Sequence, residues 1–161
     1  MNNGEFFLAD AIEVIEEILN ANGEFRMYPK GTSMLPLIKQ GEDSVILRKR
    51  LDKAALPVNK HDIAFYRRTN GQFVLHRVMK INKDGSMVMC GDNQTILEEG
   101  ISPEQIIGYV TGIYKKEKYL STSAVKYKIY TSVWCFMLYR KSIFFAKRCA
   151  LRMKQKLFGN K

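Results

Sequence analysis

The chain has 161 residues, of which 46% are hydrophobic and 26% are charged. This length and composition suffice for one globular domain with its own core, and they exclude a disordered or fibrous protein. The formal net charge is +10, but residues 118–161 hold 11 basic residues and no acid, whereas residues 1–117 hold 15 basic and 16 acidic residues. The body of the protein is therefore nearly neutral, and the C-terminal segment is basic.

The number and spacing of the cysteines limit the class of protein. Cys90, Cys135 and Cys149 lie far apart and include no Cys-x-x-Cys pair. This argues against a disulfide framework and against a zinc site. We therefore expect a reducing environment, with no metal and no cofactor.

The first predicted element is an amphipathic helix over residues 6–19, because apolar side chains recur at spacings of three and four and acids occupy the other face. Asn22-Gly23 ends this helix. From residue 25 to residue 112, short β-rich runs alternate with turn residues. The predicted strands cover residues 44–47, 62–66, 72–81, 86–90 and 106–114.

Two turns connect these strands into an antiparallel meander. Asn70-Gly71 is the strongest hairpin pattern in the chain, and Lys83-Asp84-Gly85 is a second. Ser102 before a proline indicates one brief helical turn. We therefore expect a mainly β fold, in which an antiparallel β body over residues 26–117 is flanked by an N-terminal amphipathic helix in residues 1–25 and by a basic C-terminal helical region.

The C-terminal region, residues 118–161, is interpreted as a basic, aromatic-rich amphipathic helical tail. From Arg140 onward, apolar residues recur at every third or fourth position and basic residues fill the remaining arc. Aromatic residues of the kind found at bilayer interfaces precede this stretch. They are Tyr130, Trp134, Phe136 and Tyr139.

This tail predicts peripheral association with an anionic membrane surface. The longest apolar run, residues 129–139, is much shorter than the about 20 residues that a spanning helix needs. The acidic N-terminus is unlike a secretory signal peptide, so we expect the cytoplasmic face. A tail packed on the body or on a partner is the alternative. Nucleic acid is not expected as a partner, because no recognised nucleic-acid module accompanies the charge.

Three strings in the β body contain candidate catalytic side chains. Ser33 lies in a turn of small residues, His76 lies in an otherwise apolar strand, and Asp92 lies in a turn that ends a strand. Each also has a plain structural interpretation: turn chemistry, a packed and hydrogen-bonded histidine, and an Asx-turn. Taken singly, the strings do not decide between chemistry and structure.

Together and in this order, the strings resemble the type I signal peptidase superfamily of serine endopeptidases, which has a Ser-Met-x-Pro box, a basic residue before Arg-Val, and a Gly-Asp-Asn box. The matching residues are Ser33-Met34-Leu35-Pro36, His76-Arg77-Val78 and Gly91-Asp92-Asn93. Residues 41–47 and 62–65 resemble two further family segments, the second with His61 in place of the family's glycine. The resemblance covers about residues 26–114 and implies a signal-peptidase-like catalytic domain.

The resemblance also implies roles for individual residues. Most bacterial members have lysine before Arg-Val, so His76 is similar to the endoplasmic-reticulum-like subgroup. Ser33 is then the nucleophile and His76 the general base. An acid orients the imidazole in serine triads. Asp92 is our first choice for this acid, and Glu98, six residues beyond it, is the alternative.

The oxyanion donors are expected to come from the backbone. Some bacterial members use a serine hydroxyl two residues before the nucleophile, but Gly31 holds that position here. The backbone at Gly31 and Ser33, most simply the Ser33 amide, is the candidate donor group. Arg77 alternates to the opposite strand face from His76 and is expected to be structural.

The predicted function is therefore a signal-peptidase-like serine endopeptidase that cleaves a leader or signal segment from an exported peptide or protein. Family members normally carry a spanning anchor before the serine box, where this chain has the acidic helix over residues 6–19. This departure favours a peptidase for a particular leader over general secretory processing. The alternative is a non-catalytic module of the same fold that binds a peptide or docks on a membrane.

Overall fold

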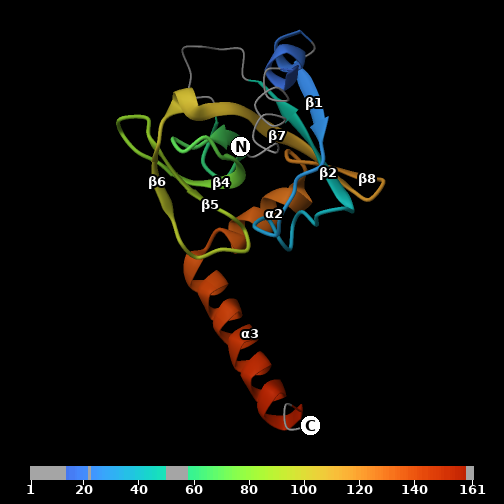
Figure 1. The fold of residues 1–161 in the computed structure, drawn as a ribbon, viewed down its shortest axis with the longest axis vertical. Coiled ribbons are helices and arrows are strands. Elements are labelled where there is room, and N and C mark those ends of the chain that lie inside the picture. Colours follow the sequence, from blue (N-terminus) through green and yellow to red (C-terminus); the bar gives the residue numbers. More distant parts are fainter. Residues whose placement is uncertain (1–13, 22, 50–57, 159–161) are drawn as a thin grey trace, which may run out of the picture.

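The structure is a computed structural model that describes residues 14–21, 23–49 and 58–158. The described residues form eight strands in one sheet, followed by two helices (Figure 1). The strands are β1 Glu24–Met27, β2 Asp43–Arg48, β3 Ile63–Arg67, β4 Phe73–Ile81, β5 Met87–Cys90, β6 Glu98–Ile101, β7 Ile106–Lys115 and β8 Lys118–Ser121. A short 3₁₀ turn, η1 Pro103–Gln105, precedes β7, and the helices α2 Val125–Trp134 and α3 Met137–Phe158 follow β8.

The sheet confirms the expected mainly β, antiparallel fold. Its strand order is β1-β2-β7-β3-β4-β5-β6, with β8 beside β7, and every neighbouring pair is antiparallel. Strands β3, β4 and β5 form a meander through the two predicted turns, and β6 extends it, whereas β7 lies between β2 and β3. All five predicted strands are present, and β1, β6 and β8 are additional.

Two hydrophobic clusters lie on the two faces of β3 and β4. One contains Phe65 and Leu75, together with Met34 from the loop before β2. The other contains Tyr66 and Val78. Because side chains alternate across a strand, most of β3 and the middle of β4 are buried on both faces, and they form the centre of the body.

The N-terminal helix is described over residues 14–21. It lies at the β1 end of the sheet (Figure 1), and Leu19 is fully buried in the first cluster. The N–H of Gly23 donates to the carbonyl of Leu19 at 3.1 Å, with φ of 72° at the glycine, which is a common helix C-terminal geometry. Residues 6–13 of the predicted helix lie outside the described residues.

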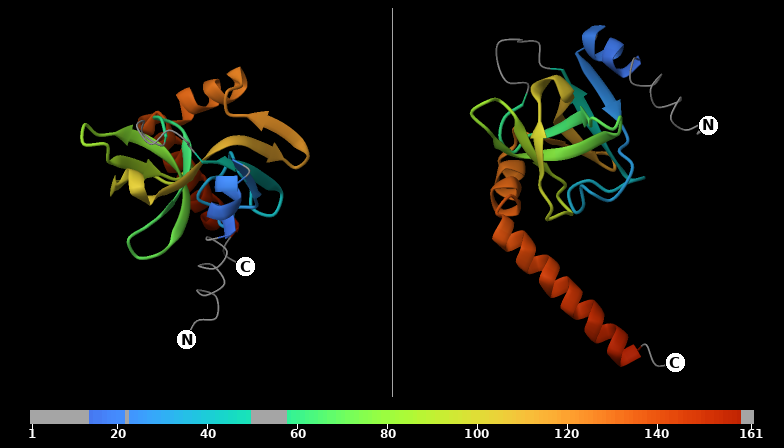
Figure 2. Two further views of the ribbon diagram at one scale, coloured as in Figure 1. Left: turned by 90° about the horizontal axis from the view of Figure 1, so that it is seen from above. Right: turned by 60° about the vertical axis from the view of Figure 1, so that its left-hand side comes forward.

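The C-terminal region is helical as predicted, but it begins later than expected. Residues Lys118–Ser121 form β8, because they pair with the end of β7. Helix α3 then extends away from the β body, as Figure 1 and the right-hand view of Figure 2 show. In the part of the chain that the structure describes, no helix is both long and apolar enough to cross a membrane.

Candidate active site

His76 lies in β4 with only 4% of its surface exposed. Its Nδ1 atom is 3.3 Å from the hydroxyl oxygen of Tyr66 in β3. That hydroxyl donates to Oε2 of Glu98 in β6 at 2.8 Å, and the carboxylate oxygen itself is 4.0 Å from Nδ1. Glu98, the alternative acid, therefore reaches the imidazole through Tyr66.

These contacts assign the neutral tautomer of His76. Since Tyr66 donates its proton to Glu98, the phenol oxygen accepts from Nδ1–H, which leaves Nε2 unprotonated. Burial, followed by the positive charge of Arg68, lowers the pKa of His76 from 6.5 to about 4, against the opposing effects of Glu98 and Asp92. At neutral pH the imidazole is therefore an uncharged base with Nε2 available for a proton.

A bidentate ion pair holds Glu98 in place. Arg68, in the β3–β4 turn, donates from Nε to Oε1 at 2.7 Å and from Nη2 to Oε2 at 2.5 Å. The hydrogen bond from Arg68 lowers the pKa of Glu98. Burial and the bond to Glu98 both raise the pKa of Tyr66. Glu98 is thus a carboxylate and Tyr66 a neutral phenol near neutral pH.

Asp92, our first choice for the acid, pairs with Arg77 and not with His76. Arg77 donates from Nε to Oδ1 at 2.7 Å and from Nη2 to Oδ2 at 2.6 Å, and both side chains are completely buried. Arg77 follows His76 in β4, so its side chain lies on the opposite face of the strand. The structure therefore brings Asp92 to Arg77 and not to the imidazole, and the side chain of Arg77 is taken up by this buried pair.

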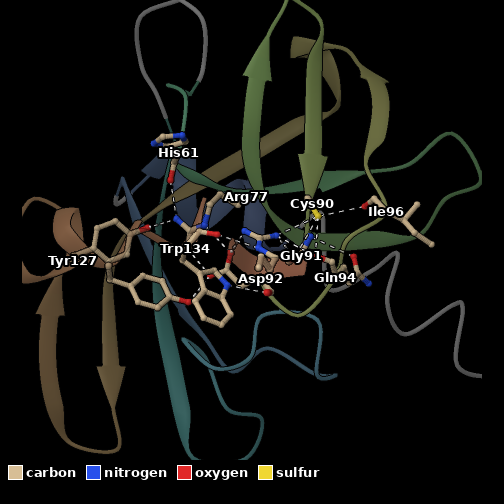
Figure 3. A network of polar contacts seen from close by, with 11 residues as sticks. His61, Arg77, Cys90, Gly91, Asp92, Gln94, Ile96, Tyr127 and Trp134 are labelled. Carbon is tan, nitrogen blue, oxygen red and sulfur yellow. Dashed lines mark hydrogen bonds and ion pairs between the residues drawn. The ribbon is translucent and has the colours of Figure 1, made fainter. Parts of the chain in front are cut away.

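Side chains of helix α2 contact the Arg77–Asp92 pair (Figure 3). The hydroxyl of Tyr127 accepts from Arg77 at 3.0 Å, and the hydroxyl of Tyr130 donates to Asp92 Oδ2 at 3.1 Å. The indole N–H of Trp134 donates to the carbonyl of Asp92 at 2.9 Å. Two aromatic side chains of α2 therefore hold the Gly-Asp-Asn turn, and a third holds Arg77.

Arg140, near the start of α3, adds a second buried guanidinium to this cluster. Its Nη1 donates to the carbonyls of Gly91 at 3.0 Å and Gln94 at 3.2 Å, and its Nε donates to the carbonyl of Trp134 at 3.1 Å. Its Nη2 lies 3.8 Å from Asp92 Oδ1 and, among the described residues, has no hydrogen-bond partner. Two buried arginines thus share one carboxylate.

Ser33 lies in the loop between β1 and β2, which packs against the Gly-Asp-Asn turn. The carbonyl of Ser33 accepts from the N–H of Asn93 at 2.7 Å. The two segments are so close that a Cβ atom at Gly91 would lie 2.7 Å from that carbonyl oxygen. The N–H of Gly31 donates to Gln40 Oε1 at 2.6 Å, so this amide is not a free oxyanion donor. Of the two backbone N–H groups considered as oxyanion donors, that of Ser33 is therefore the remaining candidate.

Ser33 and His76 line adjoining cavities. The cavity of Ser33 has a volume of about 370 Å³, that of His76 has a volume of about 590 Å³, and Arg68 borders both. Within the described segments, neither the Ser33 hydroxyl nor Nε2 of His76 has a hydrogen-bond partner. The structure therefore brings the two groups to neighbouring cavities without a hydrogen bond between them.

Three residues of the site were not expected from the sequence: Tyr66, Arg68 and Arg140. In the register of β3 and β4, Ala64 pairs with His76, so Tyr66 is the next residue on the same face of the sheet. A correctly assigned hairpin register would have identified Tyr66. Nothing in the sequence distinguishes Arg140 from the other basic residues of the tail.

His61 precedes β3, and its backbone has φ of 75°. This is the left-handed region, which glycine enters without steric cost. The carbonyl of His61 accepts from Nη1 of Arg77 at 2.8 Å. The backbone geometry therefore explains why a glycine suits this position.

The cysteines do not assemble a metal site. Cys90 and Cys135 are buried, Cys149 is half-buried, and all three are free thiols. Burial raises the pKa of both Cys90 and Cys135, so these thiols stay protonated near neutral pH. Among the residues that the structure describes, no group of three or more His, Cys, Asp or Glu side chains has a metal-binding arrangement.

The comparison with known proteins adds no relative to this picture. No family model, curated protein or solved structure matches the chain. The resemblance to signal peptidases therefore stays an expectation from the identity and order of the three boxes around Ser33, His76 and Asp92.

Proposed function

We propose that this chain is a signal-peptidase-like serine endopeptidase that removes a leader or signal segment from an exported peptide or protein. Ser33 is the nucleophile and His76 is the general base. Glu98 replaces Asp92 as the acid, and it acts through Tyr66. The observation that carries the proposal is the buried, neutral His76, with Nδ1 held by Tyr66 and Nε2 left for proton transfer, beside the cavity that Ser33 lines.

The chemistry proceeds by acyl transfer. The Ser33 hydroxyl attacks the scissile carbonyl and gives its proton to Nε2 of His76, which then protonates the leaving amine. A water that gives its proton to the same nitrogen attacks the ester carbon, the bond to Ser33 breaks, and the imidazolium returns the proton to the Ser33 oxygen. The Ser33 amide supplies an oxyanion donor. Catalytic hydrogen bonds often become short only when substrate is bound, so the unpaired Ser33 hydroxyl is compatible with this mechanism.

The test uses a mixture of peptides that have small residues before the candidate scissile bond and varied residues around it, because the resemblance implies a preference for small residues there. The products are identified by mass spectrometry. Ser33→Ala is expected to reduce cleavage by more than about a thousandfold while the fold is kept. Ser123→Ala, at an exposed position before α2, is the matched control and should cleave like the unmodified chain. Undiminished cleavage by Ser33→Ala would disprove the assignment.

A non-catalytic peptide-binding module is the second candidate function. The observation in its favour is the missing hydrogen bond between Ser33 and His76 within the described segments. It predicts that the unmodified chain binds peptides from the same mixture but releases no products. Detection of cleavage that depends on Ser33 would exclude this candidate.

We also infer peripheral membrane association through α3. Its apolar stripe comprises Ile143, Ala146, Ala150 and Met153, and the last three are exposed. A cationic amphipathic helix of this kind binds the interface of anionic bilayers. In sedimentation with phosphatidylglycerol vesicles, Ala150→Glu is expected to lose binding, whereas Ser123→Ala should retain it. Equal binding by Ala150→Glu would show that this stripe does not contact lipid.

A further inference from the structure

A third cavity extends the two that Ser33 and His76 line. It has a volume of about 640 Å³ and lies between α3 and the turn after β5. Asn93, Thr95 and Phe144 border both this cavity and that of His76. Arg68 likewise borders both the cavity of His76 and that of Ser33, so the three cavities adjoin one another in series. We call the third cavity the α3 groove.

The α3 groove is both basic and apolar. Its walls include three cations from α3, Lys141, Lys147 and Arg148, whose side chains are exposed. They also include the apolar side chains Phe144, Phe145 and Leu151. Phe145 and Leu151 are 63% and 61% exposed, so a sizeable apolar surface lies between the charges.

The cations of the groove have no acidic partner within the described segments. Lys147 contacts the ring of Phe144, with Nζ 5.7 Å from the centroid, and neither Lys141 nor Arg148 forms an ion pair there. By contrast, Arg68 in the adjoining cavity is neutralised by Glu98. Lys30, which lines the cavity of Ser33, is a further cation without an ion pair in the described segments, so three of the four unpaired cations along these cavities lie at the α3 end.

We propose that the α3 groove binds an acidic, apolar segment of the peptide substrate while the scissile bond lies at Ser33. The proposal rests on the function proposed above, and it adds the class of substrate: a leader rich in Glu or Asp interspersed with large apolar residues. Carboxylates pair with Lys141, Lys147 and Arg148, and apolar side chains cover Phe145 and Leu151.

The size of the groove suits a short peptide segment. From Lys141 to Leu151 the helix rises by about 15 Å, at 1.5 Å per residue. An extended peptide covers this length with roughly five residues, at about 3.3 Å each. A segment of this length presents two or three side chains to the groove, which matches the number of cations.

The position of the groove around α3 favours a peptide over a lipid surface as its ligand. At about 100° per residue, Arg148 and Ala150 lie about 160° apart around the helix, so the groove and the apolar stripe occupy opposite arcs. The groove face looks toward the turn that contains Asn93 and Thr95. A planar bilayer does not enter such a recess, whereas a peptide that continues to Ser33 does.

The experiment measures binding in a Ser33→Ala background, so that it does not depend on cleavage. The probes are a fluorescein-labelled peptide of repeated Leu-Glu pairs and the same peptide with Gln for Glu, read by fluorescence anisotropy. The added variant is Lys147→Gln/Arg148→Gln. The matched control is Lys126→Gln/Lys128→Gln, which removes the same charge from exposed positions of α2.

The acidic peptide is expected to bind the groove variant roughly fivefold more weakly than the control, because an exposed ion pair contributes about 0.2–1 kcal/mol and 1.4 kcal/mol is tenfold. Binding should also weaken at high salt. The proposal is overturned if the Gln peptide binds equally well, if both double variants bind alike, or if phosphatidylglycerol vesicles but not the peptide distinguish them. Cleavage that persists in Ser33→Ala would instead refute the proposed function, and it would leave the binding result for the groove unaffected.

Discussion

Asp92 and Glu98 are six residues apart and each accepts a bidentate bond from an arginine, but the two pairs differ in every other respect. Asp92 is completely buried, whereas 26% of the Glu98 side chain is exposed. Asp92 is shared by Arg77 and Arg140, while Glu98 has Arg68 and, through Tyr66, the imidazole of His76. The first cluster is closed to solvent, and the second borders a cavity.

Under the proposed function, this difference favours Glu98 over Asp92 as the acid. A completely buried carboxylate that contacts two buried guanidinium groups is suited to fix the turn that contacts the loop of Ser33. A carboxylate beside a neutral histidine at a cavity wall can stabilise a proton that arrives there. The predictions below test this division between a structural and a reactive cluster.

The largest expected effect is on the closed cluster. Asp92→Asn leaves Arg77 and Arg140 buried without a counter-charge, and breaking a buried pair in this way costs about 3–5 kcal/mol. The free energy of unfolding, measured with urea, should fall by this amount. Asp84→Asn, in the exposed β4–β5 turn, is the control and should change stability by less than about 1 kcal/mol. A similarly small loss for Asp92→Asn would mean that this cluster does not hold the turn.

The pH dependence of stability tests the reactive cluster. The pKa of His76 is about 4 in the folded protein, whereas the ordinary value, used for the unfolded chain, is 6.5. Between these two pH values the unfolded chain therefore binds more protons than the folded protein. Stability should therefore fall between pH 6.5 and pH 4 and level off below. At about 1.36 kcal/mol per pKa unit, the His76 contribution is up to about 3 kcal/mol.

His76→Gln removes the titrating imidazole. Comparison of this variant with the unmodified chain therefore separates the contribution of His76 from that of Glu98 and the other acids. The difference in unfolding free energy between the two proteins, measured across this range, should change by up to about 3 kcal/mol. Parallel curves for His76→Gln and the unmodified chain would show that the imidazole titrates alike when folded and unfolded.

A smaller effect is expected at Arg140. Arg140→Met removes the bonds to the carbonyls of Gly91 and Gln94, but it also removes the excess positive charge beside Asp92. We therefore expect a loss of about 2 kcal/mol, less than for Asp92→Asn. The fluorescence of Trp134, the single tryptophan of the chain, follows unfolding. The neighbouring Lys141→Met is the control, and equal stability of the two variants would contradict the anchoring role.

The smallest effect on stability is expected at Tyr66. Tyr66→Phe keeps the ring but removes the hydroxyl between His76 and Glu98, at a cost of about 1 kcal/mol. The Nδ1–H of His76 then loses its acceptor, so the tautomer seen in ¹⁵N NMR should shift, and peptide cleavage should fall roughly tenfold. Tyr109→Phe, in the same hydrophobic cluster, should change neither. An unchanged tautomer in Tyr66→Phe would remove Glu98 from the mechanism.

The strands with β-branched and apolar runs were predictable from the sequence, whereas strands at the margins of the sheet, such as β6 and β8, were not. β6 has the sequence Glu98-Glu99-Gly100-Ile101, which has low intrinsic strand propensity. It forms because β5 offers it a free edge. β8 depends on a turn at Lys116, where φ is 56°, a conformation that lysine rarely adopts. Neither feature appears in hydrophobic periodicity.

The candidate site was predictable only in part, because register decides which side chains meet. A two-residue turn at Asn70-Gly71 would pair Tyr66 with Leu75. The structure has a longer turn, in which the N–H of Arg68 donates to Gln72, and Tyr66 pairs with Val74. Since a shift of one residue exchanges the faces of a strand, the contact of Tyr66 with His76 required the observed turn.

The contacts between the body and its C-terminal helices have a consequence for the order of synthesis. Gly91 and Arg140 are 49 residues apart, and a ribosome adding about 5–20 residues per second needs roughly 2 to 10 seconds to make that stretch. During this interval the β body emerges with Ser33 and His76, but the turn beside Ser33 lacks its contacts with α2 and α3. A site built in this way acquires the support of α2 and α3 only after the β body has been synthesised.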